Sequence, residues 1–189
     1  MPARRTSIPL RQSFDRADKI GRMQTFGPPD SHYLSAAVGW FELGNLVEAK
    51  AELGRIVPEH FDYPDVLEVR WLLHAEEKDW QAGLSVAEKL IAVDPRRPTG
   101  WLHRAYARRR VENGGLQAAW DDLLPGVEKC PKDQTIPYNL ACYACQLGRL
   151  DEARQWLERA VKLAGKKKIK LMALNDTDLE PLWEEIKRL

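Results

Sequence analysis

Cys142 and Cys145, in the stretch ACYACQLGRLDEA (141–153), have the residue type and spacing for redox or metal chemistry. Two thiols three residues apart share one face of a helix, so both can point toward one ligand. A redox pair of this spacing stands where a strand enters a helix N-terminus, whose dipole lowers the thiol pKa. Helical sequence precedes Cys142 instead, and a zinc tetrahedron could be completed only by Cys130 and His103. We therefore favour two small apolar side chains and keep a thiol redox or metal-binding role as the alternative.

Other chemistry-bearing motifs are absent from the sequence. It contains no P-loop, no G-x-G-x-x-G, no H-E-x-x-H and no G-x-S-x-G pattern, and its four histidines have no paired ligand spacing. We predict a protein that is not an enzyme and that uses no cofactor or metal.

Composition narrows the possible partners. The chain has 29 Lys and Arg against 28 Asp and Glu, a net charge of +1, which argues against a general nucleic-acid binder. No apolar run approaches the roughly 20 residues of a membrane helix. The N-terminal residues show no apolar core of a secretory signal, and the cysteine count is odd, so we expect reduced thiols in the cytoplasm.

The sequence repeats itself at intervals of 34 to 36 residues. Small residues recur in register, and each is followed four positions later by an apolar residue; the small positions are Ala49, Gly83, Ala119 and Ala153. Twelve residues before each of them stand Ala37, Trp71, Ala107 and Ala141, and five before stand Gly44, Lys78, Gly114 and Gly148. Spacings of three and four place the apolar residues on one helix face, and glycine favours a tight turn.

Each unit therefore predicts a helix, a short turn and a second helix with a small-residue seam. Asp94-Pro95 and Cys130-Pro131 interrupt the chain between units, because proline cannot continue a helix interior. The expected helix pairs are 31–43 and 46–57, 64–77 and 80–92, 98–112 and 116–129, and 134–147 and 150–164.

The segment YNLACYACQLGRLDEARQWLERAVKL (138–163), with its N-L-A, G, D-E-A and A positions, resembles the tetratricopeptide repeat (TPR) family. The three earlier units match less fully, and the third has two extra residues near 112–115. The resemblance implies an all-α, right-handed α-solenoid of about four helix-turn-helix repeats with a C-terminal capping helix. It divides the chain into a basic arm (1–29), repeats at about 30–63, 64–97, 98–132 and 133–165, and a basic connector with capping helix (166–189).

The resemblance also implies a function, because the first helix of each TPR repeat lines a concave groove that holds a partner peptide. The chain would then be a non-catalytic interaction module, an adaptor, scaffold or co-chaperone-like protein. The positions that carry over as groove residues are Leu34, Val38, Phe41 and Glu42, then Glu68, Leu72 and Glu76, then Leu102, His103, Tyr106, Arg109 and Arg110, and finally Tyr138, Asn139, Cys142 and Gln146.

In this register the groove has a charge gradient. Glu42, Glu68 and Glu76 mark one half, and His103 with Arg108, Arg109 and Arg110 marks the other. An arginine cluster can bind carboxylates in bidentate fashion, so we expect a protein or peptide partner with an acidic segment near the third repeat. Apolar contacts would come from Phe41, Leu72, Tyr106 and Tyr138. A self-assembling homodimer is the other alternative.

The two ends allow more than one interpretation. The arm carries six basic residues and either stays loose or packs on the first repeat or into the groove. The run GKKKIK (165–170) predicts a solvated connector in preference to an anion contact. Beyond it, Thr177 or Asp178 is a plausible N-cap for an amphipathic helix that covers the last repeat, in preference to one that detaches to bind a partner.

Overall fold

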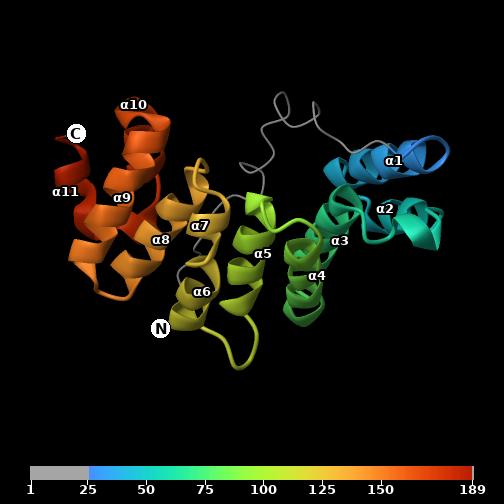
Figure 1. Cartoon of the computed structure of the whole chain (residues 1–189), viewed down its shortest axis with the longest axis horizontal. Coiled ribbons are helices and arrows are strands. Elements are labelled where there is room, and N and C mark those ends of the chain that lie inside the picture. The colour runs from blue at the N-terminus through green and yellow to red at the C-terminus, as the bar shows by residue number, and fades with distance from the viewer. Residues whose placement is uncertain (1–25, 189) are drawn as a thin grey trace. The chain divides into compact units, whose positions relative to one another are not determined.

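A computed structural model describes residues 26–188 of the chain, and these residues form helices and turns without a strand (Figure 1). They divide into two compact units, residues 26–122 and residues 123–188. Most of the predicted basic arm (1–29) lies outside the described residues. No helix among the described residues is long and apolar enough to cross a membrane.

Most helices begin and end within one residue of the predicted positions, but those predicted over 46–57 and 98–112 end four residues early, at Leu53 and Arg108. The first unit contains α1 (Asp30–Glu42), α2 (Leu46–Leu53), the 3₁₀ turn η3 (Pro58–His60), α3 (Pro64–Glu76), α4 (Trp80–Val93), α5 (Pro98–Arg108) and nearly all of α6 (Leu116–Leu123). The second contains α7 (Gly126–Lys129), α8 (Thr135–Gln146), α9 (Leu150–Ala164), α10 (Lys166–Ala173), the 3₁₀ helix η4 (Thr177–Leu182) and α11 (Trp183–Ile186). The predicted helix over 116–129 is interrupted between α6 and α7, where Pro125 stands.

Small residues line the seam inside each packed helix pair. α1 packs on α2, α3 on α4, and α8 on α9. Ala37 and Ala49 are fully buried in the first pair, and Ala141 and Ala153 in the last. The second pair divides the volume differently: a Cβ placed on Gly83 would lie 3.5 Å from Nε1 of Trp71. A large side chain on α3 therefore occupies the space that a missing side chain on α4 leaves.

Three of the turns between paired helices share one backbone geometry. Gly44, Lys78 and Gly148 have φ values of +79°, +60° and +77°. After each of them, the next amide donates to a carbonyl five residues back, as Asn45 N does to Trp40 O at 2.9 Å. This is the Schellman end of a helix, which favours glycine because left-handed φ strains other residues. Lys78 is thus the strained member of the set.

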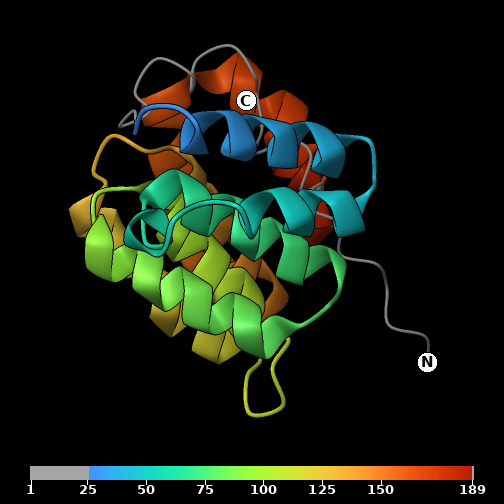
Figure 2. The same ribbon diagram turned by 90° about the vertical axis from the view of Figure 1, so that its right-hand side faces the viewer.

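The turn of the third repeat is longer, and it contains the two extra residues near 112–115. The loop after α5 projects beyond the helices (Figure 2), and its positive-φ glycine is Gly115 at +125°, not Gly114. Gly114 is required for another reason, because a Cβ there would stand 1.7 Å from the carbonyl oxygen of Arg108. Across the turn, Arg108 Nε donates to Asp122 Oδ2 of α6 at 2.8 Å.

The start of α1 is tied to the segment that precedes α3. Asp30 is 3% exposed, and its carboxylate lies 2.6 Å from Nδ1 of His60 and accepts from the amide of Val57 at 3.2 Å. Phe26 stacks on the His60 ring with centroids 4.8 Å apart and meets Tyr63 edge-on. Phe26, on the predicted arm, is thus part of the first repeat's core.

The C-terminal segment differs from its prediction. GKKKIK is not a connector, because Lys166–Ala173 forms helix α10, whose Ile169 and Ala173 are fully buried. The expected single amphipathic helix is divided into η4 and α11, and Asp176 is the N-cap, its side chain accepting from the amide of Asp178. η4 packs on α8 and α10 on α9, so this segment covers the last helix pair.

The shared turn geometry makes Lys78 a stabilisation site. We expect Lys78→Gly to raise the free energy of unfolding by about 0.5–1 kcal/mol, because relief of left-handed strain exceeds the added chain entropy. Gly148→Ala should lower it by about 1 kcal/mol at the matching turn. Urea unfolding of the two variants measures both changes. A Lys78→Gly protein no more stable than wild type would contradict the strain.

Candidate functional site

The leading helices α1, α3 and α5 of the first unit lie next to one another, with α3 in contact with both α1 and α5. The structure sorts the predicted groove residues by exposure. Leu34, Leu72, His103, Tyr138, Asn139 and Cys142 are buried, and Glu42 and Glu76 are exposed. The remaining residues are partly exposed: Val38, Phe41, Glu68, Leu102, Tyr106, Arg109, Arg110 and Gln146. The buried residues, including the expected apolar contacts Leu72 and Tyr138, present almost no surface to a guest.

The expected arginine cluster is divided by the structure. Arg108 faces Asp122 at 2.8 Å and Glu88 at 3.6 Å, so its charge is balanced within the first unit. His103 is buried and stacks on Trp71, with centroids 3.7 Å apart and an interplanar angle of 6°. Arg109 and Arg110 are the partly exposed cations of the predicted set that stand at the end of α5. The basic half of the predicted groove is therefore reduced to Arg109 and Arg110 at the end of α5.

Aromatic rings support Arg110. Its guanidinium carbon lies 3.4 Å from the Tyr106 centroid and 5.2 Å from the Trp80 centroid, and Nη1 donates to the Tyr106 carbonyl at 2.8 Å. Tyr106 in turn meets Trp71 and Trp80 edge-on, with centroids 5.9 and 5.7 Å away. Cation–π contacts of this kind hold a guanidinium in a fixed position.

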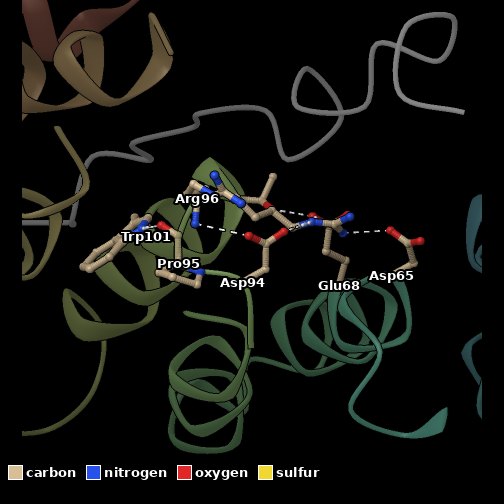
Figure 3. A network of polar contacts seen from close by, with 8 residues as sticks. Asp65, Glu68, Asp94, Pro95, Arg96 and Trp101 are labelled. Atoms are coloured by element: carbon tan, nitrogen blue, oxygen red, sulfur yellow. Dashed lines mark hydrogen bonds and ion pairs between the residues drawn. The ribbon is translucent and has the colours of Figure 1, made fainter. Parts of the chain in front are cut away.

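Glu68 belongs to an ion-pair network, so its charge does not add to the acidic half of the predicted groove. Arg97 lies 2.7 Å from Asp65, 3.3 Å from Glu68 and 3.7 Å from Asp94, and Thr99 Oγ1 donates to Glu68 (Figure 3). Burial opposes the charge of Arg97, yet the surrounding carboxylates, Glu68 first, raise its pKa.

The loop between α4 and α5, which contains Asp94 and Arg97, is also held by hydrogen bonds of its own. Trp101 Nε1 donates to the Pro95 carbonyl at 2.9 Å, and the Arg96 amide donates to Asp94 Oδ1 at 3.2 Å (Figure 3). The network thus joins the start of α3 to the loop before α5, which sets the spacing of the leading helices. Asp94-Pro95 had indicated only a chain break, and Asp65 with Glu68, one helical turn apart, was the signal available for a shared cation.

The cysteine pair lies inside the second unit. Cys142 is fully buried, and its Sγ is 3.5 Å from Oδ2 of Asp176, which also accepts from Tyr138 Oη at 3.0 Å. Burial first, and then the Asp176 carboxylate, raise the pKa of the Cys142 thiol well above its usual value. Burial likewise raises the pKa of Cys145. Both changes favour the thiol over the thiolate, the opposite of an activated redox pair.

A metal centre finds no support in the same region. Among residues 26–188, no three or more His, Cys, Asp or Glu side chains are grouped so that they could hold an ion. Asp176, which sequence reasoning overlooked, comes 34 residues after Cys142, and only the return of η4 over α8 brings it close.

Comparisons with known proteins identify the fold. No protein-family model matches the sequence, and no curated protein matches it. Among solved structures, TTC0263, a thermophilic TPR protein of Thermus thermophilus, is 18% identical with a TM-score of 0.60, covering 85% of this chain and all of that one.

Two further structures are similar to the same extent. MamA from residue 41 onward, of Desulfovibrio magneticus RS-1, is 16% identical with a TM-score of 0.60, covering 87% of this chain and 94% of that one. The hetero-tetramer Cut9-Hcn1 is 15% identical with a TM-score of 0.58, covering 83% of this chain and 30% of that one. The chain has the all-α fold of TPR solenoid proteins, as the sequence predicts.

The raised thiol pKa makes stability depend on pH in one direction. The contribution of a buried neutral thiol is complete below the unfolded pKa of about 8.5 and is lost above it, because the unfolded chain ionises first. We expect the free energy of unfolding to fall by up to about 1.4 kcal/mol per pH unit for each such thiol above that pH.

Urea unfolding at about pH 7 to 9.5 reads this dependence, and Cys142→Ala should show a smaller decline. The comparison keeps Tyr138 in both proteins, so the difference reports the cysteine. Equal declines, or rapid alkylation of Cys142 in the native protein at neutral pH, would contradict a buried protonated thiol.

Proposed function

We propose that the chain is a non-catalytic protein-interaction module that binds a peptide or helix of a partner protein. The contact surface is the leading-helix face, which we define as Val38, Phe41, Glu42, Glu76, Leu102, Tyr106, Arg109 and Arg110. The predicted groove residues that are buried are left out of this face, and so are those of the second unit. Glu68 is also left out, because it is already paired with Arg97 and Thr99.

The arginine and aromatic cluster at the end of α5 carries the proposal. Tyr106 is partly exposed and rests on Trp71 and Trp80, so its ring has a fixed position and loses little freedom when a guest covers it. Arg110 is held against the same rings. An apolar anchor beside a positioned guanidinium suits a guest that places an acidic residue next to an apolar one.

The fold supports a binding role in general. A chain of the hetero-tetramer Cut9-Hcn1 has a similar fold, so this arrangement of helices occurs in a protein that assembles with another protein. The cytoplasmic location expected from the sequence stays a prediction. Homodimer formation is the alternative use of the face, and light scattering over a range of concentrations distinguishes it from partner binding.

Selection from a displayed library of random peptides tests this function while the natural partner is still unidentified. Wild-type protein should enrich peptides that carry an acidic residue beside an apolar one. Arg109→Glu/Arg110→Glu should bind those peptides at least about tenfold more weakly, because charge-assisted hydrogen bonds are replaced by repulsion.

Lys129→Glu/Lys132→Glu is the matched control, since it makes the same change of charge at two exposed residues of the second unit. It should keep the wild-type affinity. Circular dichroism establishes that both variants fold. If the arginine variant binds the enriched peptides as well as the control does, the leading-helix face is not the contact surface.

A further inference from the structure

A cleft of about 260 Å³ opens between α2 and α3, within the first unit. Its apolar wall consists of Leu53, Phe61, Val66 and Leu73. Lys50, Arg70 and His74 add basic groups, and Gly54 leaves its edge open. A buried cavity of about 150 Å³ accommodates benzene, whereas cofactor-sized ligands occupy about 300–1,000 Å³. The cleft therefore has room for one large apolar side chain.

This cleft is separate from the leading-helix face. Successive residues of an α-helix are rotated by about 100°. On α3 the cleft residues Val66, Arg70 and His74 thus share one side, and the face residue Glu76 lies on another. A guest in the cleft would leave the leading-helix face unoccupied.

The basic groups of the cleft are incompletely paired. The Arg70 guanidinium lies 6.0 Å from the Phe61 centroid and has no carboxylate partner among the described residues. Nδ1 of His74 is buried without a hydrogen bond, with the nearest carboxylate oxygen, of Asp79, at 3.6 Å. Lys50 pairs with Glu77, so that carboxylate is already engaged. Arg70 is thus the cation of the cleft lining that has no carboxylate beside it among the described residues.

The corresponding interface of the next repeat, between α4 and α5, has its charges balanced. The residues 34 positions after Gly54, Arg70 and His74 are Glu88, Arg104 and Arg108. Arg104 lies over Trp101, as Arg70 does over Phe61, but it also has Asp122 at 3.6 Å. Arg108 has Glu88 at 3.6 Å. Where the α4–α5 interface has Glu88, the α2–α3 interface has Gly54 and an open cleft.

We propose that the α2–α3 cleft is a second docking site, which binds a partner segment with a large apolar side chain next to a carboxylate. The side chain fills the space beside Gly54 and packs on Leu53, Phe61 and Val66. The carboxylate, from an acidic residue or a chain end, enters at the edge beside Gly54 and contacts the Arg70 guanidinium. The site does not rest on the proposed function of the leading-helix face.

The minimal probe is N-acetyl-L-phenylalanine, which combines one aromatic side chain with one carboxylate, and its primary amide is the uncharged control. Both are titrated into the full chain while the backbone amide signals of Gly54, Arg70 and His74 are followed by NMR. We expect saturable shifts with the acid at a Kd on the order of a millimolar, as befits a fragment of this size. The amide should bind about tenfold more weakly.

Two variants locate the site, and one provides the control. Arg70→Gln should weaken the acid about tenfold and leave the amide unchanged. Gly54→Glu should abolish acid binding by supplying the carboxylate from the chain itself. Its backbone is helical at φ −69°, and the added Cβ makes only ordinary contacts of 3.4 Å. Arg159→Gln, an arginine over Trp156 in the second unit, should bind as wild type does.

The results separate the possible occupants. Equal affinity for acid and amide, or full acid affinity in Arg70→Gln, would overturn the proposal, and so would shifts confined to residues outside the cleft. Cleft signals that move with protein concentration alone would assign the cleft to a second copy and overturn it as well. If Arg70→Gln fails to fold, Gly54→Glu decides the question, since retained acid binding there is incompatible with the cleft.

Discussion

The close approach of the two helices in each pair is the constraint on which the rest of the structure depends. Two helix axes can approach only if the side chains between them have a combined size that fits, because protein interiors are as densely packed as crystals. The first and last pairs satisfy this with a fully buried alanine on each helix, Ala37 and Ala49 in one and Ala141 and Ala153 in the other. The second pair satisfies it with unequal partners, Trp71 and Gly83. Those seams fix which residues of each leading helix face outward.

Basic side chains of the first unit are held in two different ways, by carboxylates or by aromatic rings. Asp122 and Glu88 hold Arg108, and Asp65, Glu68 and Asp94 hold Arg97, so these arginines stabilise the stack. Arg110 is held by aromatic rings, and Arg70 lies over Phe61 in an open cleft. The rings fix the position of a guanidinium without neutralising its charge, whereas a carboxylate partner does neutralise it.

The repeat architecture could be predicted from the sequence because it rests on local signals. Small residues at a fixed interval, turn glycines and prolines between units indicate each helix pair, and each of these helices begins within one residue of its predicted start. The ends were predicted less well, because the helices expected to reach 57, 112 and 129 end at Leu53, Arg108 and Leu123. Contacts that join distant parts of the chain left no such signal. The return of η4 over α8, which buries Tyr138 and Cys142 beside Asp176, and the division of the arginines between carboxylates and rings depend on tertiary packing. Residues 166–170 are helical because lysine has a high helix propensity and because Ile169 is buried, and the burial depends on tertiary packing.

A double-mutant cycle between Trp71 and Gly83 tests the seam most directly. We expect Trp71→Ala to lower the free energy of unfolding by about 3–5 kcal/mol through the cavity it leaves, and Gly83→Leu by about 1–3 kcal/mol through overpacking. Because the added leucine can occupy the vacated volume, the double variant should lose at least about 1 kcal/mol less than the sum. Additive losses, within about 0.5 kcal/mol, would contradict the claim that complementary volumes at this seam hold the helix pair together.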